Sequence, residues 1–153
     1  PRVVIAVWDA GHVSIRLSPN GDTQGCDDPD PASLFGHAAK VCQELGIGFV
    51  ELRQPGPEGT FGRTDVPKQD AVIRAAYKGT LVLNSDYTAE AAEADVVSGR
   101  CDAVSFGRPF ISNPDLPWRI RNGAEWAPNV NVPQSWYLPG EAGYIDYPAL
   151  QPG

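Results

Sequence analysis

The sequence predicts an α/β protein built on a parallel sheet. Four short apolar runs, which begin near residues 12, 47, 80 and 101, alternate with stretches whose pattern is typical of helices. Strands that alternate with helices pair in parallel, because a crossover helix returns the chain to the same end of the sheet. Apolar residues at nearly every position indicate strands that are covered on both faces. Four such units form either a small open doubly wound sheet or half of an eight-unit barrel.

The first part of the chain predicts the end of a helix, a strand and a loop. Residues 3–8 are apolar and are followed by Gly11, which we expect in the left-handed conformation that ends a helix. Residues 12–18 alternate between apolar and polar side chains, which predicts the first strand. Residues 20–31 are rich in Asn, Gly, Asp and Pro, which predicts a loop.

The second unit begins with a capped helix. Ser33 is the expected N-cap of a helix that runs to about Leu45 and ends at Gly46. The apolar strand 47–53 follows, and then a long loop, 54–67. The expected buried face of the helix consists of Leu34, Ala38, Val41, Cys42 and Leu45.

The third and fourth units repeat this order. Residues 68–77 predict a short helix, and 80–84 a short buried strand. Thr88 is the expected N-cap of a helix over 89–98, which Gly99 ends.

The last strand is expected over 101–106, and Asp115 is expected to cap a helix over 116–121. Residues 124–153 carry several prolines and tyrosines without periodicity, which predicts a packed tail.

Composition narrows the class of protein. The 153 residues are 42% apolar and 20% charged, which is typical of a globular domain with a core. A net charge of −7 argues against nucleic acid as a partner, because phosphates require a basic face. No apolar run reaches the ~18 residues that span a bilayer, so no membrane association is expected. The chain contains no Met and opens on Pro1, which indicates a fragment or a processed piece.

The cysteines indicate free thiols. Cys26, Cys42 and Cys101 are odd in number and show no CxxC spacing, so neither a disulfide framework nor a zinc site is expected. Free thiols are typical of a reducing cytosol, which predicts a cytoplasmic protein. Cys42 and Cys101 fall on apolar stretches and are expected to be buried.

The carboxyl ends of the strands form the functional edge of either fold. Arg16 lies inside an apolar strand near this edge, where a guanidinium is costly unless an anionic group accompanies it. It either forms an ion pair with Glu51 on the neighbouring strand or serves as a fixed cation beside a developing negative charge.

Gly107 and Arg108 follow the last strand and indicate a phosphate site. Glycine allows close approach of the backbone to a ligand, and the arginine fork matches phosphate oxygens. A helix near Pro109 would direct its N–H groups to the same place. The alternative is an ion pair between Arg108 and Asp115. In a barrel, the loop at 84–85 would join this phosphate site.

Other candidate sites give little evidence of function. His12 and His37 have no Ser, Cys or Asp arrangement that would make a triad. The acidic loop over 20–30 lacks EF-hand spacing, and so no metal site is expected.

Four segments together resemble the C-terminal half of the old yellow enzyme family, and the resemblance covers essentially the whole chain. That family includes N-ethylmaleimide reductase, xenobiotic reductases and oxophytodienoate reductases. The segments are Arg16-Leu17-Ser18-Pro19, Tyr87-Thr88-Ala89-Glu90, Gly107-Arg108-Pro109-Phe110-Ile111-Ser112-Asn113-Pro114-Asp115-Leu116-Pro117 and Gly143-Tyr144-Ile145-Asp146-Tyr147-Pro148.

The resemblance implies four βα units, strands five to eight of a TIM (β/α)8 barrel, with FMN at its carboxyl face. Arg16 would then lie beside the flavin N1 and C2 carbonyl, where it favours the reduced anionic ring. Arg108 and the Gly107 backbone would hold the FMN phosphate, with help from the backbone of Asn84 and Ser85. Many members have glycine near 84–85, so Asn84-Ser85 departs from the pattern.

The resemblance also implies a substrate pocket. Trp136 would edge the flavin and Tyr137 the pocket, although the first position is more often Phe. Members pass hydride from NADH or NADPH through the flavin to an activated alkene or a nitro compound. The pair that binds the substrate oxygen and the proton-donating Tyr belong to the earlier half of the family's barrel, so no catalytic acid is expected within this chain.

The resulting hypothesis is an FMN-binding half-barrel over 1–123 with a tail over 124–153 that packs at the barrel rim. It would form part of an NAD(P)H-dependent reductase and would be active only with an N-terminal half-barrel as partner. The alternative is a non-enzymatic half-barrel that binds FMN weakly or self-associates into a homo-oligomer, because open sheet edges seek partners. A standalone flavodoxin-like binder is a third hypothesis.

Overall fold

The computed structural model describes residues 1–22, 25–59, 62, 64–128, 137 and 139–150. The chain forms two compact units, Pro1–Ser105 and Phe106–Gly153. Each unit is described by itself below.

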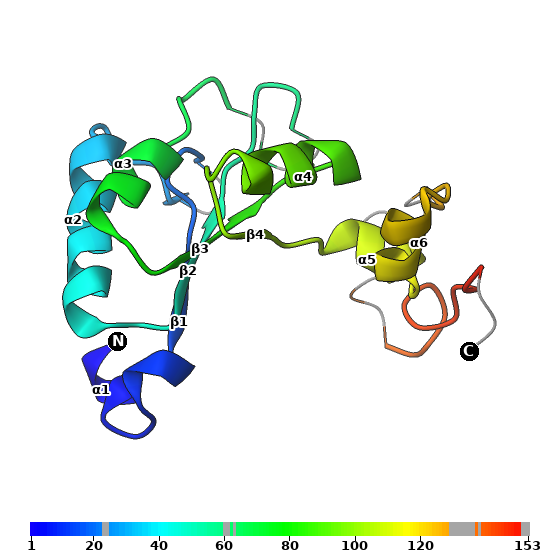
Figure 1. The fold of residues 1–153 in the computed structure, drawn as a ribbon, viewed down its shortest axis with the longest axis horizontal. Coiled ribbons are helices and arrows are strands. Elements are labelled where there is room, and N and C mark those ends of the chain that lie inside the picture. Colours follow the sequence, from blue (N-terminus) through cyan, green and yellow to red (C-terminus); the bar gives the residue numbers. More distant parts are fainter. Residues whose placement is uncertain (23–24, 60–61, 63, 129–136, 138, 151–153) are drawn as a thin grey trace. The chain divides into compact units, whose positions relative to one another are not determined.

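The first unit is built on a parallel sheet in which the strands follow chain order (Figure 1). All three neighbouring pairs are parallel, which confirms the predicted α/β class. The strands are β1 (Ser14–Leu17), β2 (Phe49–Arg53), β3 (Thr80–Asn84) and β4 (Ala103–Val104).

Helices connect these strands. In Figure 1, α2 and α3 lie side by side next to the sheet. The helical elements of this unit are α1 (Arg2–Ile5), the 3-10 turn η1 (Ala10–His12), α2 (Pro31–Leu45), α3 (Asp70–Ala76) and α4 (Ala89–Val97).

One face of the sheet supplies the core. Val50, Leu52, Leu81 and Leu83 are essentially inaccessible to solvent. The alternate residues of these strands point to the opposite face, which is only partly covered. The helices complete the core with Phe35, Ala39, Cys42, Ile73 and Tyr77. The sheet therefore has one apolar, helix-covered face and one polar, open face.

Helix α2 differs from its prediction in cap and in face. Asp30 is the N-cap, and its Oδ1 accepts a 3.2 Å hydrogen bond from the Ser33 N–H, so the expected Ser33 cap is wrong. Proline at the first position of α2 starts the helix three residues earlier than predicted. Leu34 is 47% exposed, and Phe35 and Ala39 are buried in its place beside Cys42. The helix end at Gly46, with φ of 64°, is confirmed.

The start of the chain also differs. Gly11 lies within η1 and has no positive φ, so it does not end a helix as predicted. The Gly48 N–H donates hydrogen bonds to the carbonyls of Ala10 and Val13, at 3.0 and 2.8 Å. A Cβ on Gly48 would collide with the Gly11 carbonyl oxygen. These bonds occupy the backbone before Phe49, and so β2 begins there and not at residue 47.

Helix α4 and strand β3 agree with the prediction. Thr88 caps α4 by accepting a 3.2 Å hydrogen bond from the Ala91 N–H. Strand β4 is shorter than the predicted 101–106, although ladder bonds to the Leu81 and Leu83 carbonyls extend from Asp102 to Ser105.

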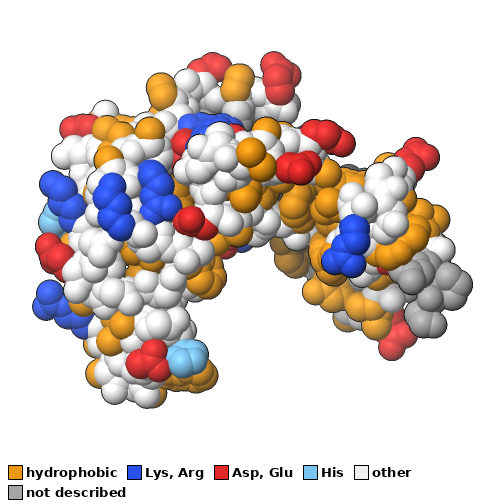
Figure 2. All heavy atoms as spheres, in the orientation of Figure 1, with side chains coloured by type: hydrophobic (Ala, Val, Ile, Leu, Met, Phe, Trp, Pro, Cys, Tyr) orange, Lys and Arg blue, Asp and Glu red, His pale blue; other side chains and the backbone are white. Residues whose placement is uncertain are grey.

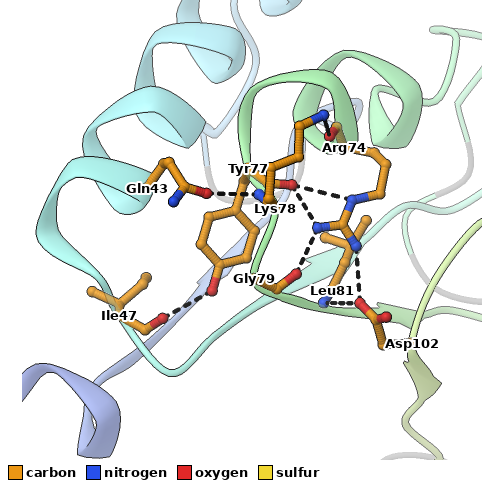
Figure 3. A network of polar contacts seen from close by, with 8 residues as sticks. All are labelled: Gln43, Ile47, Arg74, Tyr77, Lys78, Gly79, Leu81 and Asp102. Carbon is orange, nitrogen blue, oxygen red and sulfur yellow. Dashed lines mark hydrogen bonds and ion pairs between the residues drawn. The ribbon is translucent and has the colours of Figure 1, made fainter.

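A polar network closes the turn before β3 (Figure 3). The Arg74 guanidinium donates to the carbonyls of Tyr77 and Gly79 and forms a 2.9 Å ion pair with Asp102. The Asp102 carboxylate also accepts a 2.8 Å hydrogen bond from the Leu81 N–H. Burying these backbone groups without partners would be costly, and one arginine satisfies two carbonyls. The network therefore stabilises the amino end of the strands.

The second unit contains α5 (Arg108–Ser112) and α6 (Leu116–Asn122), and the predicted helix over 116–121 is confirmed. Asn113 is fully buried and exchanges hydrogen bonds with the backbone of Ala127. The buried Arg119 forms a 2.7 Å ion pair with Asp115. These contacts fix the segment that follows α5.

Charge is unevenly distributed over the surface. Figure 2 shows basic side chains gathered over α2 and α3 and acidic side chains on α4. Cys42 and Cys101 are buried as predicted, and burial raises the pKa of both thiols. Across the described ranges, none of the helices has the length and apolar character needed to cross a membrane.

Candidate functional site

Four polar side chains form a closed ring on the open face of the sheet. They are Arg16 of β1, Glu51 of β2, Asn84 of β3 and Ser105, which follows β4. Arg16 pairs in register with Glu51. Asn84 lies two residues beyond the register partner of Glu51 on β3, and so on the same face of the sheet and nearer the carboxyl end of the strands. The first three strands therefore contribute one residue each, and the residue that follows β4 contributes the fourth.

The Arg16 guanidinium has two partners in this ring. Its Nη2 donates a 2.7 Å hydrogen bond to Asn84 Oδ1, and its Nε lies 3.7 Å from Glu51 Oε2. The Arg16 side chain remains 52% exposed, whereas that of Glu51 is 17% exposed. The guanidinium is therefore fixed along one edge and open along the rest.

Ser105 completes the ring. Asn84 Nδ2 donates to both the carbonyl oxygen and the Oγ of Ser105 at 2.9 Å, and Ser105 Oγ donates to Glu51 Oε1 at 2.5 Å. Because each side chain is held by at least two partners, the ring pre-organises the Arg16 charge. Pre-organised charge of this kind stabilises negative charge that develops on a bound group.

The turn after β3 has an unusual backbone. Ser85 has φ of 101° and Asp86 has φ of 52°. Residues with a Cβ rarely adopt such angles, and strain of this kind is concentrated at ligand-binding turns. The turn directly follows Asn84, so it lies at the same carboxyl edge as the ring.

A network of ion pairs and hydrogen bonds begins at Tyr87, directly after this turn. The Tyr87 hydroxyl donates a 2.6 Å hydrogen bond to Asp95, whose carboxylate also accepts from Arg100 at 3.0 Å. Arg100 binds both oxygens of Asp70, at 2.7 and 3.1 Å, and Asp70 accepts from Gln54 at 3.3 Å. The network ties the turn after β3 to the end of β2 and to α3.

The network changes the ionisation of its members. Burial would raise the pKa of Asp70, but the hydrogen bonds and positive charge of Arg100 bring that pKa below its ordinary value. Burial and the Asp95 carboxylate raise the pKa of Tyr87. The Asp70 carboxylate is therefore ionised and Tyr87 neutral across the physiological range.

Two of the predicted phosphate residues, Gly107 and Arg108, lie in the second unit, whereas Asn84 and Ser85 lie in the first. Gly107 is the N-cap of α5 and Arg108 is its first residue. The φ of Gly107 is −99°, and no heavy atom beyond its neighbours lies within 4 Å of a Cβ placed on it. Neither backbone conformation nor packing therefore requires glycine here, and the phosphate role of Gly107 stays a prediction.

Other predicted residues contribute less to this geometry. Trp136 lies outside the described residues, and Tyr137 is 86% exposed. His12 contacts Asp9 at 2.5 Å on the surface. Within the part of the chain that the structure describes, no three His, Cys, Asp or Glu side chains group as metal ligands.

Of the two roles that the sequence left open for Arg16, the structure contains the ion pair with Glu51, and the role of a fixed cation beside a developing negative charge stays a prediction. The Glu51 ion pair is present, and the guanidinium still offers an open edge. The side chains of Asn84 and Ser105 were missed as partners. Only the strand register aligns these two residues, and a single sequence does not provide that register.

The fold and the fixed arginine at the carboxyl edge of a parallel sheet define a protein suited to an anionic cofactor. Residues 2–126 match the model of the NADH:flavin oxidoreductase / NADH oxidase family, and the chain belongs to this family. The prediction of a flavin cofactor and a nicotinamide reductant is thereby confirmed for the family.

Solved structures and curated relatives agree with this assignment. The old yellow enzyme homologue from Zymomonas mobilis is 46% identical, with a TM-score of 0.92 over 97% of this chain and 41% of that one. Morphinone reductase is 33% identical, with a TM-score of 0.86 over 97% of this chain and 39% of that one. The resemblance to old yellow enzymes is confirmed.

Among curated relatives, putative 12-oxophytodienoate reductase 12 of Oryza sativa subsp. japonica is 33% identical over 96% of this chain. Chanoclavine-I aldehyde reductase of Penicillium roqueforti is 34% identical over 95%. The chain spans 38% and 40% of the lengths of these two relatives.

Proposed function

We propose that this chain is the FMN-binding part of a cytoplasmic NAD(P)H-dependent flavin oxidoreductase that reduces activated alkenes or nitro compounds. The observation that carries the proposal is Arg16, which the ring fixes along one edge and leaves open along the rest. The family assignment makes FMN the group that this guanidinium would face.

The proposal assigns the ring system and the phosphate of FMN to different residues of the chain. Arg16 would lie beside the part of the ring system where negative charge collects on reduction, and its fixed charge would stabilise the reduced form. Arg108 and the Gly107 backbone would hold the phosphate, helped by the backbone at Asn84 and Ser85. The open space at Gly107 and the positive φ of Ser85 support this role.

When bound, FMN supplies the hydride chemistry, and the chain supplies orientation and charge. Trp136 would edge the ring system and Tyr137 the substrate pocket. NADH or NADPH would be the reductant. The catalytic acid and the groups that bind the substrate oxygen would come from another part of the barrel.

The proposal includes a second half-barrel that would complete the sheet. Residues 1–123 would form strands five to eight of a TIM barrel, and 124–153 a tail at its rim. The open face carries the half-exposed Phe49 and Arg16. An N-terminal half-barrel, in the same protein or on a separate chain, would cover this face and pair with β1 and β4.

The test is a visible spectrum followed by complementation. The purified chain is mixed with FMN and an N-terminal half-barrel of an old yellow enzyme, and flavin absorbance and NADPH oxidation are recorded. We expect both only in the mixture. A mixture that neither retains FMN nor oxidises NADPH overturns the proposal and favours the non-enzymatic, self-associating half-barrel. Light scattering on the chain alone measures that self-association.

A further inference from the structure

We propose that Glu51 is a charge-setting residue for Arg16: its carboxylate offsets part of the guanidinium charge and so lowers the midpoint potential of the bound flavin. This inference rests on the proposed FMN site. It assigns a role in cofactor tuning to a side chain that would itself act only through Arg16.

The geometry separates what orients Arg16 from what sets its charge. Orientation comes from the 2.7 Å hydrogen bond to Asn84 Oδ1. The contact from Arg16 Nε to Glu51 Oε2, at 3.7 Å, is longer than a hydrogen bond and acts through charge. Removing the Glu51 charge therefore leaves the guanidinium in place.

Glu51 is itself held toward Arg16. Ser105 Oγ donates a 2.5 Å hydrogen bond to Glu51 Oε1, which restrains rotation of the carboxylate. The strand register places Glu51 directly beside Arg16, and its side chain is 17% exposed. Water therefore screens the Glu51 carboxylate less than it screens the half-exposed Arg16 side chain.

The sign follows from electrostatics. Reduction places negative charge on the flavin ring, and a nearby positive charge favours that state while a nearby negative charge opposes it. Arg16 and Glu51 together present a dipole, and Arg16 alone presents a full cation. Loss of the carboxylate charge should therefore make the bound flavin easier to reduce.

The experiment measures the midpoint potential of the FMN-loaded complex, by spectral titration against a reference dye, for wild type and for Glu51→Gln. The glutamine has nearly the same shape, and its amide oxygen can still accept from Ser105. We expect a more positive potential in E51Q, and a potential near that of the wild type in Glu51→Asp, which keeps the charge. Glu93→Gln removes an exposed carboxylate on α4 and should leave the potential unchanged.

The outcomes separate this inference from the function on which it rests. An E51Q complex that retains FMN with an unchanged or more negative potential overturns the inference alone. A wild-type complex that does not bind FMN overturns the function and the inference together. If E51Q does not fold, Glu51→Ala takes its place, because it removes the same charge without adding an amide. The same more positive midpoint potential is expected for it. A merely structural role would alter stability in these variants and leave the potential unchanged.

Discussion

Arg16 on β1 reaches across β2 to bind Asn84 on β3, through a 2.7 Å hydrogen bond between residues 68 positions apart in sequence. The intervening strand contributes Glu51, which forms an ion pair with the guanidinium. The position of the cation is therefore set by a residue two strands away and its charge environment by its immediate neighbour.

Replacement of Asn84 by alanine should weaken FMN binding. The change removes the acceptor that orients Arg16 and the donor to Ser105, and a hydrogen bond to a charged group contributes about 1.5–3 kcal/mol. We expect an affinity loss of roughly tenfold or more, measured by quenching of FMN fluorescence on titration. This FMN affinity and those below are measured on the complex with the N-terminal half-barrel. Asn122→Ala, which removes an exposed amide bonded to the Trp118 carbonyl, is the control and should bind FMN normally. Equal affinities for the two variants would contradict the prediction.

Replacement of Arg108 by alanine should remove the phosphate anchor. Charged contacts to phosphate contribute about 1.5–3 kcal/mol, so the FMN dissociation constant should rise roughly 10- to 100-fold. Riboflavin, which lacks the phosphate, should bind wild type and variant equally.

Arg74→Ala provides a matched arginine control. It breaks the network of Figure 3 and leaves the Tyr77 and Gly79 carbonyls without their donor. We expect a loss of about 2 kcal/mol in unfolding free energy with no change in FMN affinity. An R108A protein whose FMN affinity equals that of R74A would rule out the assigned anchor.

Replacement of Ser85 by glycine should stabilise the protein. Ser85 has φ of 101°, where a Cβ is strained by about 1–3 kcal/mol, and glycine relieves this strain at a smaller entropic cost. We expect a higher Tm by calorimetry, with a net gain of about 0.5–1 kcal/mol.

Ser98→Gly is the control for this substitution. Ser98 has φ of −72° at the end of α4, so glycine there relieves no strain and should lower the Tm. A lower Tm in both variants would show that Ser85 is not strained.

Replacement of Asp70 by asparagine should change how stability depends on pH. The folded pKa of Asp70 lies below its ordinary value of 3.8, so the unfolded chain takes up a proton more readily than the folded one. The stabilisation is complete above pH 3.8 and is lost as the pH falls through 3.8 toward the lower folded pKa. D70N should lose about 1–3 kcal/mol at neutral pH and show a shallower decline below about pH 4.

Urea unfolding of wild type and D70N at a series of pH values measures this difference. The other acidic groups are the same in both proteins, so their contributions cancel. Parallel curves of unfolding free energy against pH would contradict the assigned role of Asp70.

The parallel sheet could be predicted because the sequence signals for its strands and helices are local. Apolar strands, Thr88 as a cap and Gly46 as a helix end act within a few residues of one another. The start of β2 was missed because Gly48 binds Ala10 and Val13, which lie more than thirty positions earlier in the chain. A contact of that separation leaves no periodic pattern in the sequence.

The residues of the candidate site also divide into those that the sequence could single out and those that it could not. Arg16 and Arg108 could be singled out because a charge at the end of an apolar run is conspicuous. Ser105 and the Asn84 side chain could not, because uncharged polar residues are common at strand ends. Their importance depends on strand register, which pairs Leu83 with Val104 and so aligns the residues that follow.

The ring takes side chains from β1, β2, β3 and the residue after β4, and two of its bonds join residues 54 and 68 positions apart. Contacts of such separation form late in folding, because the closure entropy of long loops opposes them. A partly folded chain can contain its helices and still lack a fixed Arg16. We therefore expect the proposed cofactor site to form after the helices, once Asn84 and Ser105 have reached Arg16 and Glu51.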